Sequence, residues 1–103
     1  MARTHIRKET AAGTDIVAVE MAPTSDTNWY AAAEIRVAEI EKGTDYVRKD
    51  GKNVIREIDS FGFNARGSRA PGTNYDACLS AAARAVDRAV DDLAHEKDDD
   101  YEI

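Results

Sequence analysis

The feature that most constrains the fold is a stripe of apolar residues at helical spacing near the C-terminus. The stripe consists of Tyr75, Leu79, Ala82, Val86, Ala89 and Leu93, which follow one another at steps of four and three. This period predicts an amphipathic helix, with Thr73 or Asn74 as its expected cap. Because such a helix is stable only when its apolar side is buried, the rest of the chain must provide a second layer.

The N-terminal part of the chain shows the two-residue alternation that is typical of β-strands. In Asp15–Met21, the side chains of Val17 and Val19 share one side, as the period of a strand requires. We expect Thr4–Thr10 to pair with this strand across a turn at residues 11–14.

The stretch Trp29–Lys42 fits two patterns. With a period of two, Ala33, Ile35 and Val37 share one face of a strand. With a helical period, Ala33, Val37 and Ile40 form one stripe of a helix. The alternation of charged and apolar residues in its middle, together with the strand before it, favours a strand.

Asp50-Gly51 is a strong turn signal. Tyr46–Arg48 precedes it and the alternating segment Asn53–Ile58 follows it, so we predict a β-hairpin across this turn. The second strand is expected to continue through Phe61–Phe63.

Together these elements predict an α+β fold: a small antiparallel sheet of three to four strands, arranged as a meander, with one long C-terminal amphipathic helix packed on one face. The helix is rich in alanine and can therefore lie close to the sheet. The sheet residues expected to meet it are Val17, Val19, Ile55 and Phe61. The chain of 103 residues has the size of one domain, which we assign to residues 1–97, and residues 98–103 are expected to form an acidic, frayed tail.

Composition argues against several classes of protein. No apolar run reaches the roughly 20 residues that cross a bilayer, and we expect no secretory signal at the first residues, which lack an apolar centre. The single cysteine, Cys78, fits a reducing, cytoplasmic compartment and a buried position.

His5 and His95 stand at opposite ends of the chain. We therefore predict no catalytic residues, metal ligands or cofactor, and we expect the protein not to be an enzyme.

The net charge of −6 comes entirely from the C-terminal end of the chain. Residues 1–86 include 12 acidic and 12 basic residues, whereas residues 87–103 include 8 acidic and 2 basic residues. Carboxylates on the helix and in the tail would attract a basic partner surface. The residues predicted to bind a protein are Asp87, Asp91, Asp92, Asp98, Asp99 and Asp100.

Nucleic-acid binding is the alternative hypothesis, and it rests on basic residues of the hairpin and of the loop before the helix. That loop runs into a helix N-terminus, where free backbone N–H groups can receive an anion such as a phosphate. The residues of this alternative site are Arg48, Lys49, Lys52, Arg56, Arg66 and Arg69. Because the chain as a whole is acidic, and phosphate contacts rest on Lys and Arg, the protein-binding hypothesis is favoured.

The favoured hypothesis is a small acidic protein-binding module, such as a phage or mobile-element inhibitor of a host CRISPR or restriction complex. Such an inhibitor would act by occupying a basic surface of its target. Aromatic residues are enriched at interfaces, so Trp29, Tyr30 and Tyr46 are candidate contacts, although packing in the core or at its edge is the favoured alternative for them. A sheet edge at Thr4–Thr10 or Tyr46–Arg48 could also pair with a second copy, which leaves a homodimer open.

Overall fold

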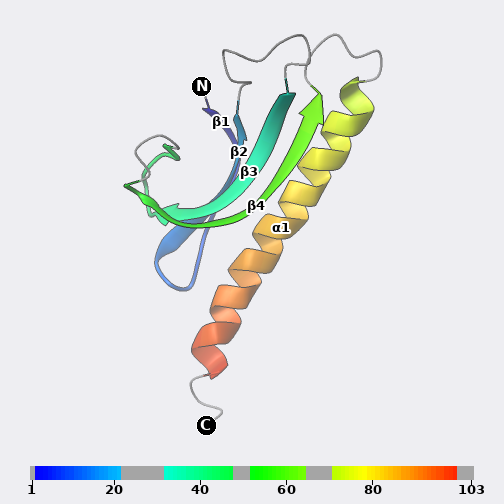
Figure 1. Cartoon of the computed structure of the whole chain (residues 1–103). Coiled ribbons are helices and arrows are strands. Elements are labelled where there is room, and N and C mark those ends of the chain that lie inside the picture. Colours follow the sequence, from blue (N-terminus) through cyan, green and yellow to red (C-terminus); the bar gives the residue numbers. More distant parts are fainter. Residues whose placement is uncertain (1, 22–31, 48–51, 65–70, 100–103) are drawn as a thin grey trace.

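The computed structural model describes residues 2–21, 32–47, 52–64 and 71–99. Its elements are strands β1 (Ala2–Glu9), β2 (Thr14–Met21), β3 (Ala32–Glu41) and β4 (Val54–Asn64), followed by helix α1 (Pro71–Asp99). The strands form one antiparallel sheet in the order β1-β2-β3-β4, and α1 packs on one of its faces (Figure 1). The predicted α+β fold, a meander followed by one C-terminal helix, is confirmed.

The stretch that fitted both a strand and a helix is strand β3. It pairs with β2, where Ala38 lies opposite Val17, and with β4, where Ile35 lies opposite Phe61. Both faces of β3 are buried, since Ile35 has no exposed surface on the helix side and Ala38 has none on the other side. An amphipathic helix would bury only one stripe of this segment. As a strand, the segment buries apolar side chains on both of its faces, and the predicted strand is therefore confirmed.

β1 pairs with β2 across the predicted turn. The backbone N–H of Thr10 donates to the carbonyl of Thr14 at 2.8 Å, and Gly13 has a φ of +82° within the turn. A β-bulge at His5 shifts the pairing of β1 by one residue. As a result, the adjacent residues His5 and Ile6 both contact groups on the helix side of the sheet.

The predicted hairpin around Asp50-Gly51 is wrong in its first strand. The partner of β4 is β3, with Val54 opposite Ile40, and not Tyr46–Arg48. β3 is the better partner because its ten residues offer a long apolar strand already paired to β2. The second strand continues to Asn64, as predicted, and the turn at residues 50–51 lies outside the described residues.

Tyr46 lies instead against the face of the sheet that α1 does not cover. The residue is 5% exposed and belongs to a buried cluster with Val17, Val19 and Ile40. Its hydroxyl donates a hydrogen bond to Glu57 Oε2 at 2.9 Å. The ring of Tyr46 therefore packs in the core, which is the alternative that the sequence favoured for it.

The sheet buries apolar residues on both faces, and the face of β2 that meets α1 is opposite to the one expected. On the helix side, the residues without exposed surface are Ile16, Ala18, Ile35, Val37, Ala82 and Val86. Val17 and Val19 were predicted to meet the helix but lie on the other face, and Ile55 is 52% exposed. Phe61 does pack on the helix side, as predicted. Since both sides of β2 are apolar, alternation alone could not identify the side that α1 covers.

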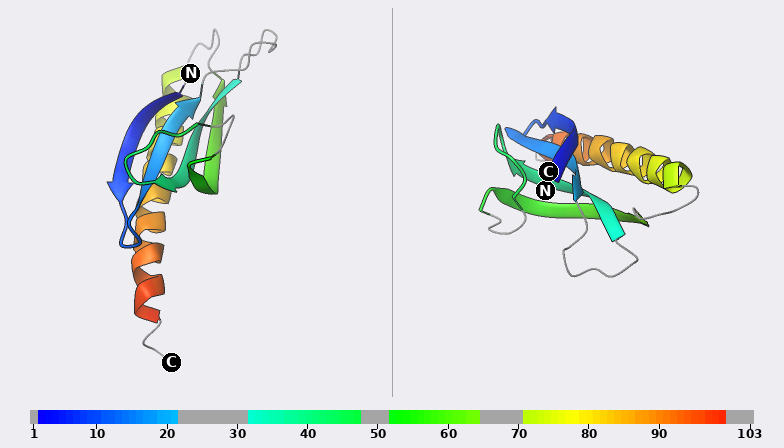
Figure 2. Two further views of the ribbon diagram at one scale, coloured as in Figure 1. Left: turned by 90° about the vertical axis from the view of Figure 1, so that its left-hand side faces the viewer. Right: turned by 90° about the horizontal axis from the view of Figure 1, so that it is seen from above.

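α1 buries the predicted stripe, with Ala82 and Val86 at its centre. The helix begins at Pro71, before the expected cap at Thr73 or Asn74, and its bounds include Asp98 and Asp99. Proline suits the first position of a helix. Figure 1 shows α1 on the outer side of the bent sheet, and Figure 2 shows its C-terminal turns extending past the turn between β1 and β2. No helix among the described residues is long and apolar enough to cross a membrane.

Gly43, in the loop after β3, is a site where the backbone requires glycine. Its φ is +79°, and its N–H donates to the buried carboxylate of Asp15 at 3.0 Å. Gly43→Ala is expected to lower the free energy of unfolding by about 1–2 kcal/mol, because a Cβ strains this conformation. No atom lies within 4 Å of the added Cβ, so the loss would come from the backbone and not from a clash.

Gly62→Ala is the matched control for this substitution. Gly62 lies in β4 without a positive φ, and a Cβ there would meet Ala33 O at an ordinary 3.8 Å. Urea unfolding of both variants measures the difference. If both variants lost the same free energy of unfolding, the positive φ of Gly43 would not be the cause of the loss.

Candidate functional site

Asp87, Asp91 and Asp92 of α1 are exposed, but they do not form an uninterrupted patch. Asp87 Oδ1 lies 2.6 Å from Lys8 Nζ of β1, and Asp91 Oδ1 lies 3.4 Å from His95 Nε2. Exposed ion pairs of this kind contribute only about 0–1 kcal/mol, so a partner protein could replace either contact. Asp92 is set apart from these two, since it lines a cavity beside β4.

The other predicted acidic residues lie at the end of α1. Residues 96–103 include five acidic residues and one basic residue. Asp98 and Asp99 belong to the last turn of the helix, whereas Asp100 lies outside the described residues. The dipole of a helix places partial negative charge at its C-terminus, which adds to these carboxylates. The C-terminal turns of α1 extend past the sheet (Figure 2).

Most of the basic residues of the alternative site lie outside the described residues, namely Arg48, Lys49, Arg66 and Arg69. Lys52 is exposed on the loop before β4. Arg56 Nε lies 3.3 Å from Glu39 Oε1, and Glu39 is a buried residue that also accepts a hydrogen bond from Thr14 Oγ1 at 2.7 Å. Arg56 therefore neutralises a carboxylate of the fold, which leaves less of its charge for a phosphate.

The remaining residues singled out in the sequence are three aromatic residues and Cys78. Trp29 and Tyr30 lie outside the described residues, and Tyr46 lies in the core as described above. Cys78 is buried, and its thiol lies 3.4 Å from the carbonyl oxygen of Gly62. Within the described ranges, no group of three or more His, Cys, Asp or Glu side chains is arranged to hold a metal ion.

A cavity of about 220 Å³ lies between β4 and the middle of α1. Its lining residues are Arg56, Ile58, Asp59, Ala85, Arg88, Ala89 and Asp92. The two arginines and two aspartates balance one another in charge. The cavity therefore selects neither an anion nor a cation by its charge.

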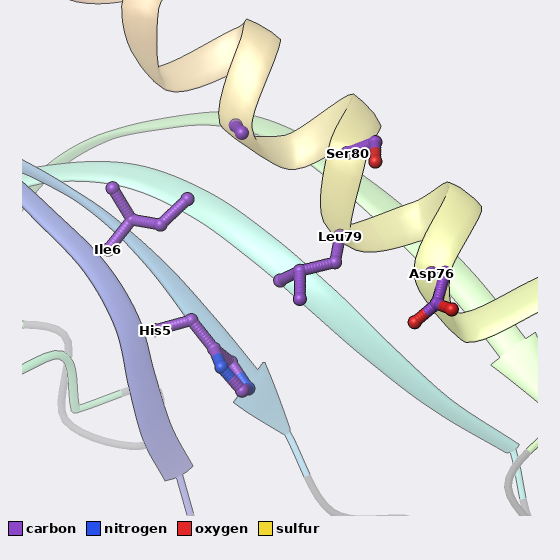
Figure 3. A pocket seen from close by; sticks show the side chains of 6 residues that line it. His5, Ile6, Asp76, Leu79 and Ser80 are labelled. Atoms are coloured by element: carbon purple, nitrogen blue, oxygen red, sulfur yellow. The ribbon is translucent and has the colours of Figure 1, made fainter. Parts of the chain in front are cut away.

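A larger and more open pocket, of about 400 Å³, lies between β1 and the N-terminal half of α1 (Figure 3). Its lining residues are His5, Ile6, Asp76, Leu79, Ser80 and Ala83. Figure 3 shows Ile6 of β1 and Leu79 of α1 pointing toward the space between the two elements, with the carboxylate of Asp76 at one end. The pocket thus combines an apolar interior with a polar rim.

His5, which lines this pocket, belongs to a group of three hydrogen-bonded side chains. Glu20 Oε1 lies 2.8 Å from His5 Nε2 and accepts a hydrogen bond from the Tyr75 hydroxyl at 2.9 Å. The contact with His5 lowers the pKa of Glu20, whereas burial raises the pKa of Tyr75. Glu20 is therefore a carboxylate and Tyr75 a neutral phenol at neutral pH. This arrangement ties together β1, β2 and α1.

Sequence reasoning gave no role to His5, which stands near the start of the chain. The structure holds its side chain at 15% exposure between Glu20 and the hydroxyl of Tyr75, 3.2 Å away. These residues are 15 and 70 positions from His5 in the chain. Their meeting depends on the bulge in β1 and on the face that α1 covers, and neither feature has a signal in the sequence.

Comparison with known proteins assigns the chain to no family. No protein-family model, curated protein or solved structure matches it. Its function is therefore inferred from its own residues and their arrangement.

Proposed function

We propose that the chain is a small, non-enzymatic protein-binding module that docks the acidic end of α1 onto a basic surface of a partner. The observation that supports this proposal is the concentration of acidic residues at the end of the helix that extends past the sheet (Figure 1). A helical end presents its backbone in one conformation, so less conformational entropy is lost on binding than with a disordered tail.

Asp87 and Asp91 extend this acidic surface along the exposed side of α1. Their side chains are 64% and 69% exposed, and their present partners Lys8 and His95 are also largely exposed. An arginine of a partner could take the place of either contact and form two parallel hydrogen bonds to the carboxylate. Attraction between such a surface and a basic protein would also speed association.

The partner that fits this surface is a protein that binds nucleic acid. Its surface would carry Lys and Arg for contacts with phosphates, and the carboxylates of α1 offer the same sign of charge as a phosphate backbone. When α1 occupies the basic surface of the partner, DNA or RNA cannot bind to that surface. This is the action expected of a phage or mobile-element inhibitor of a host CRISPR or restriction complex. The proposal places the protein in the cytoplasm, where Cys78 would stay reduced.

Neutralising the acidic helix is expected to weaken capture of the partner about tenfold at low salt, because the attraction is electrostatic. The variant carries Asp91→Asn, Asp92→Asn, Asp98→Asn and Asp99→Asn. The measurement is capture of host-lysate proteins on the immobilised chain after nuclease treatment, repeated at increasing salt. Capture by the wild-type chain should fall as salt rises.

A control variant with Glu41→Gln and Asp45→Asn removes two negative charges outside α1, at residues that are also exposed. This variant should retain capture. Equal capture by the acidic-helix variant and the wild type would remove α1 from the interface. Capture that disappears after nuclease treatment would instead favour nucleic-acid binding and contradict the proposal.

A further inference from the structure

β1 is an edge strand of the sheet, and a pocket lies beside it. In the described part of the chain β1 pairs with β2 alone, so the backbone groups on its outer side are available to another strand. Two contacts link β1 to α1: the hydroxyl of Tyr75 lies 3.2 Å from His5 Nε2, and Lys8 Nζ lies 2.6 Å from Asp87 Oδ1. The pocket of Figure 3 lies between these contacts along β1.

The interior of this pocket suits an apolar side chain. Ile6 and Leu79 are half-buried residues at the rim of the larger core cluster, and Ala83 adds only a methyl group to the lining. The volume of about 400 Å³ is large enough for a side chain such as Leu or Phe. Burial of such a side chain against these residues is favourable because it removes apolar surface from water on both sides.

The rim of the pocket is acidic at one end. Asp76 is exposed, lines the pocket and forms no ion pair with a described residue. Asp76 is the one carboxylate among the described residues that line the pocket. Asp76 therefore determines the sign of the charge that a ligand meets there, and it favours Lys or Arg.

We propose that the outer edge of β1 and this pocket bind an extended peptide segment of a partner protein. The peptide adds to the sheet beside β1, places one apolar side chain in the pocket and places Lys or Arg next to Asp76. Side chains two residues apart lie on the same face of a strand, so the basic residue stands two positions from the apolar residue. Backbone hydrogen bonds to β1 supply affinity, and the pocket with Asp76 supplies selectivity.

This surface is separate from the acidic end of α1. Asp76 lies near the start of the helix, and Asp98 and Asp99 lie in its last turn. His5, which lines the pocket, is held by contacts with Glu20 and Tyr75 before any peptide arrives, which reduces the ordering needed on binding. The peptide site can therefore exist whether or not the helix end binds a basic partner.

The test uses an array of capped heptapeptides with Leu, Ile or Phe at the centre and Lys, Ala or Glu two residues to either side. The full-length chain is expected to bind members with Lys most tightly and members with Glu least tightly. Hydrogen exchange measured with the tightest-binding member should show slower exchange of amides in β1 and no change in β4. This pattern would place the peptide on the predicted edge.

Asp76→Lys is the decisive variant, because Asp76 is exposed and its replacement leaves the core unchanged. It should reverse the preference, weakening the Lys peptides about fivefold and favouring the Glu peptides, as expected for an exposed charge pair. Asp91→Lys makes the same change in charge on the same helix outside the pocket, and it should leave the ranking of peptides unaltered. Ala83→Phe should fill the pocket and abolish binding, with thermal unfolding as the check on its folding.

Three results would overturn this inference. The first is an array on which no member binds more tightly than a polyalanine peptide. The second is binding with the same Lys preference in Asp76→Lys as in the wild type. The third is a dimer, detected by light scattering, whose outer β1 amides exchange slowly even without peptide. A second copy of the chain would then occupy the edge of the sheet.

Discussion

Replacing Ile35 by alanine is expected to lower the free energy of unfolding by about 2–5 kcal/mol, the range for deletion of a buried aliphatic side chain. Ile35 has no exposed surface and lies in β3 beneath α1, within the larger buried cluster. The substitution removes apolar contacts and leaves a cavity that the rigid sheet cannot close. Domains of this size are stable by only about 5–15 kcal/mol, so the variant would be partly unfolded at moderate temperature.

Ile55→Ala provides a matched control for this substitution. It removes the same atoms from the neighbouring strand β4, but Ile55 is 52% exposed. Its loss should be below about 1 kcal/mol, because little apolar surface is returned to water. Both values come from urea unfolding. The slope of the unfolding free energy against urea concentration shows whether the two variants expose the same surface area on unfolding. Similar losses for the two isoleucines would contradict the described burial of β3.

Asp15→Asn is expected to lower the free energy of unfolding at pH 7 by about 1–3 kcal/mol, because two hydrogen-bond donors lose a charged acceptor. The carboxylate of Asp15 accepts hydrogen bonds from Gly43 N at 3.0 Å and from Arg7 Nη1 at 2.6 Å. The side chain is 7% exposed, so water cannot readily replace the lost contact. The loop after β3 should become less firmly attached to the sheet in this variant.

The same carboxylate makes stability depend on pH. The hydrogen bond from Gly43, together with Arg7, holds the pKa of Asp15 below its ordinary value, despite the opposing effect of burial. A carboxyl group with a lowered pKa stabilises the folded state above its unfolded pKa of about 4, and this contribution disappears as the pH falls through the folded pKa. Glu20, whose pKa is lowered by His5, adds to the loss in acid.

The measurement is urea unfolding from pH 7 down to pH 2 for the wild type, Asp15→Asn and Asp45→Asn. The free energy of unfolding should differ most between the wild type and Asp15→Asn at pH 7, and this difference should become smaller below about pH 4. Asp45→Asn is the control, because the side chain of Asp45 is 92% exposed and its change should have little effect at pH 7. A difference for Asp15→Asn that stays constant across this range would show that charge is not the source of the stabilisation.

Periodicity in the sequence determined the main elements of this protein. The steps of four and three from Tyr75 to Leu93 predicted α1, and the two-residue alternation predicted β2 and favoured a strand for β3. These patterns are informative because a helix or strand with one buried face repeats apolar residues at the period of its backbone. The acidic character of the C-terminal end was also evident, since it requires only a count of charges.

Tertiary structure alone decided which surfaces those elements present. Both sides of β2 are apolar, so only packing determines that Ile16 faces α1 and Val17 faces Tyr46. The pairing of β4 with β3, rather than with a strand nearer in the chain, depends on contacts between the two strands, which the local spacing of residues does not specify. The pocket beside β1 likewise requires a bulge at His5 and a helix that begins about 70 residues later to meet at one place. Local spacing records the period of each element, whereas contacts between elements depend on the register and packing of the whole chain.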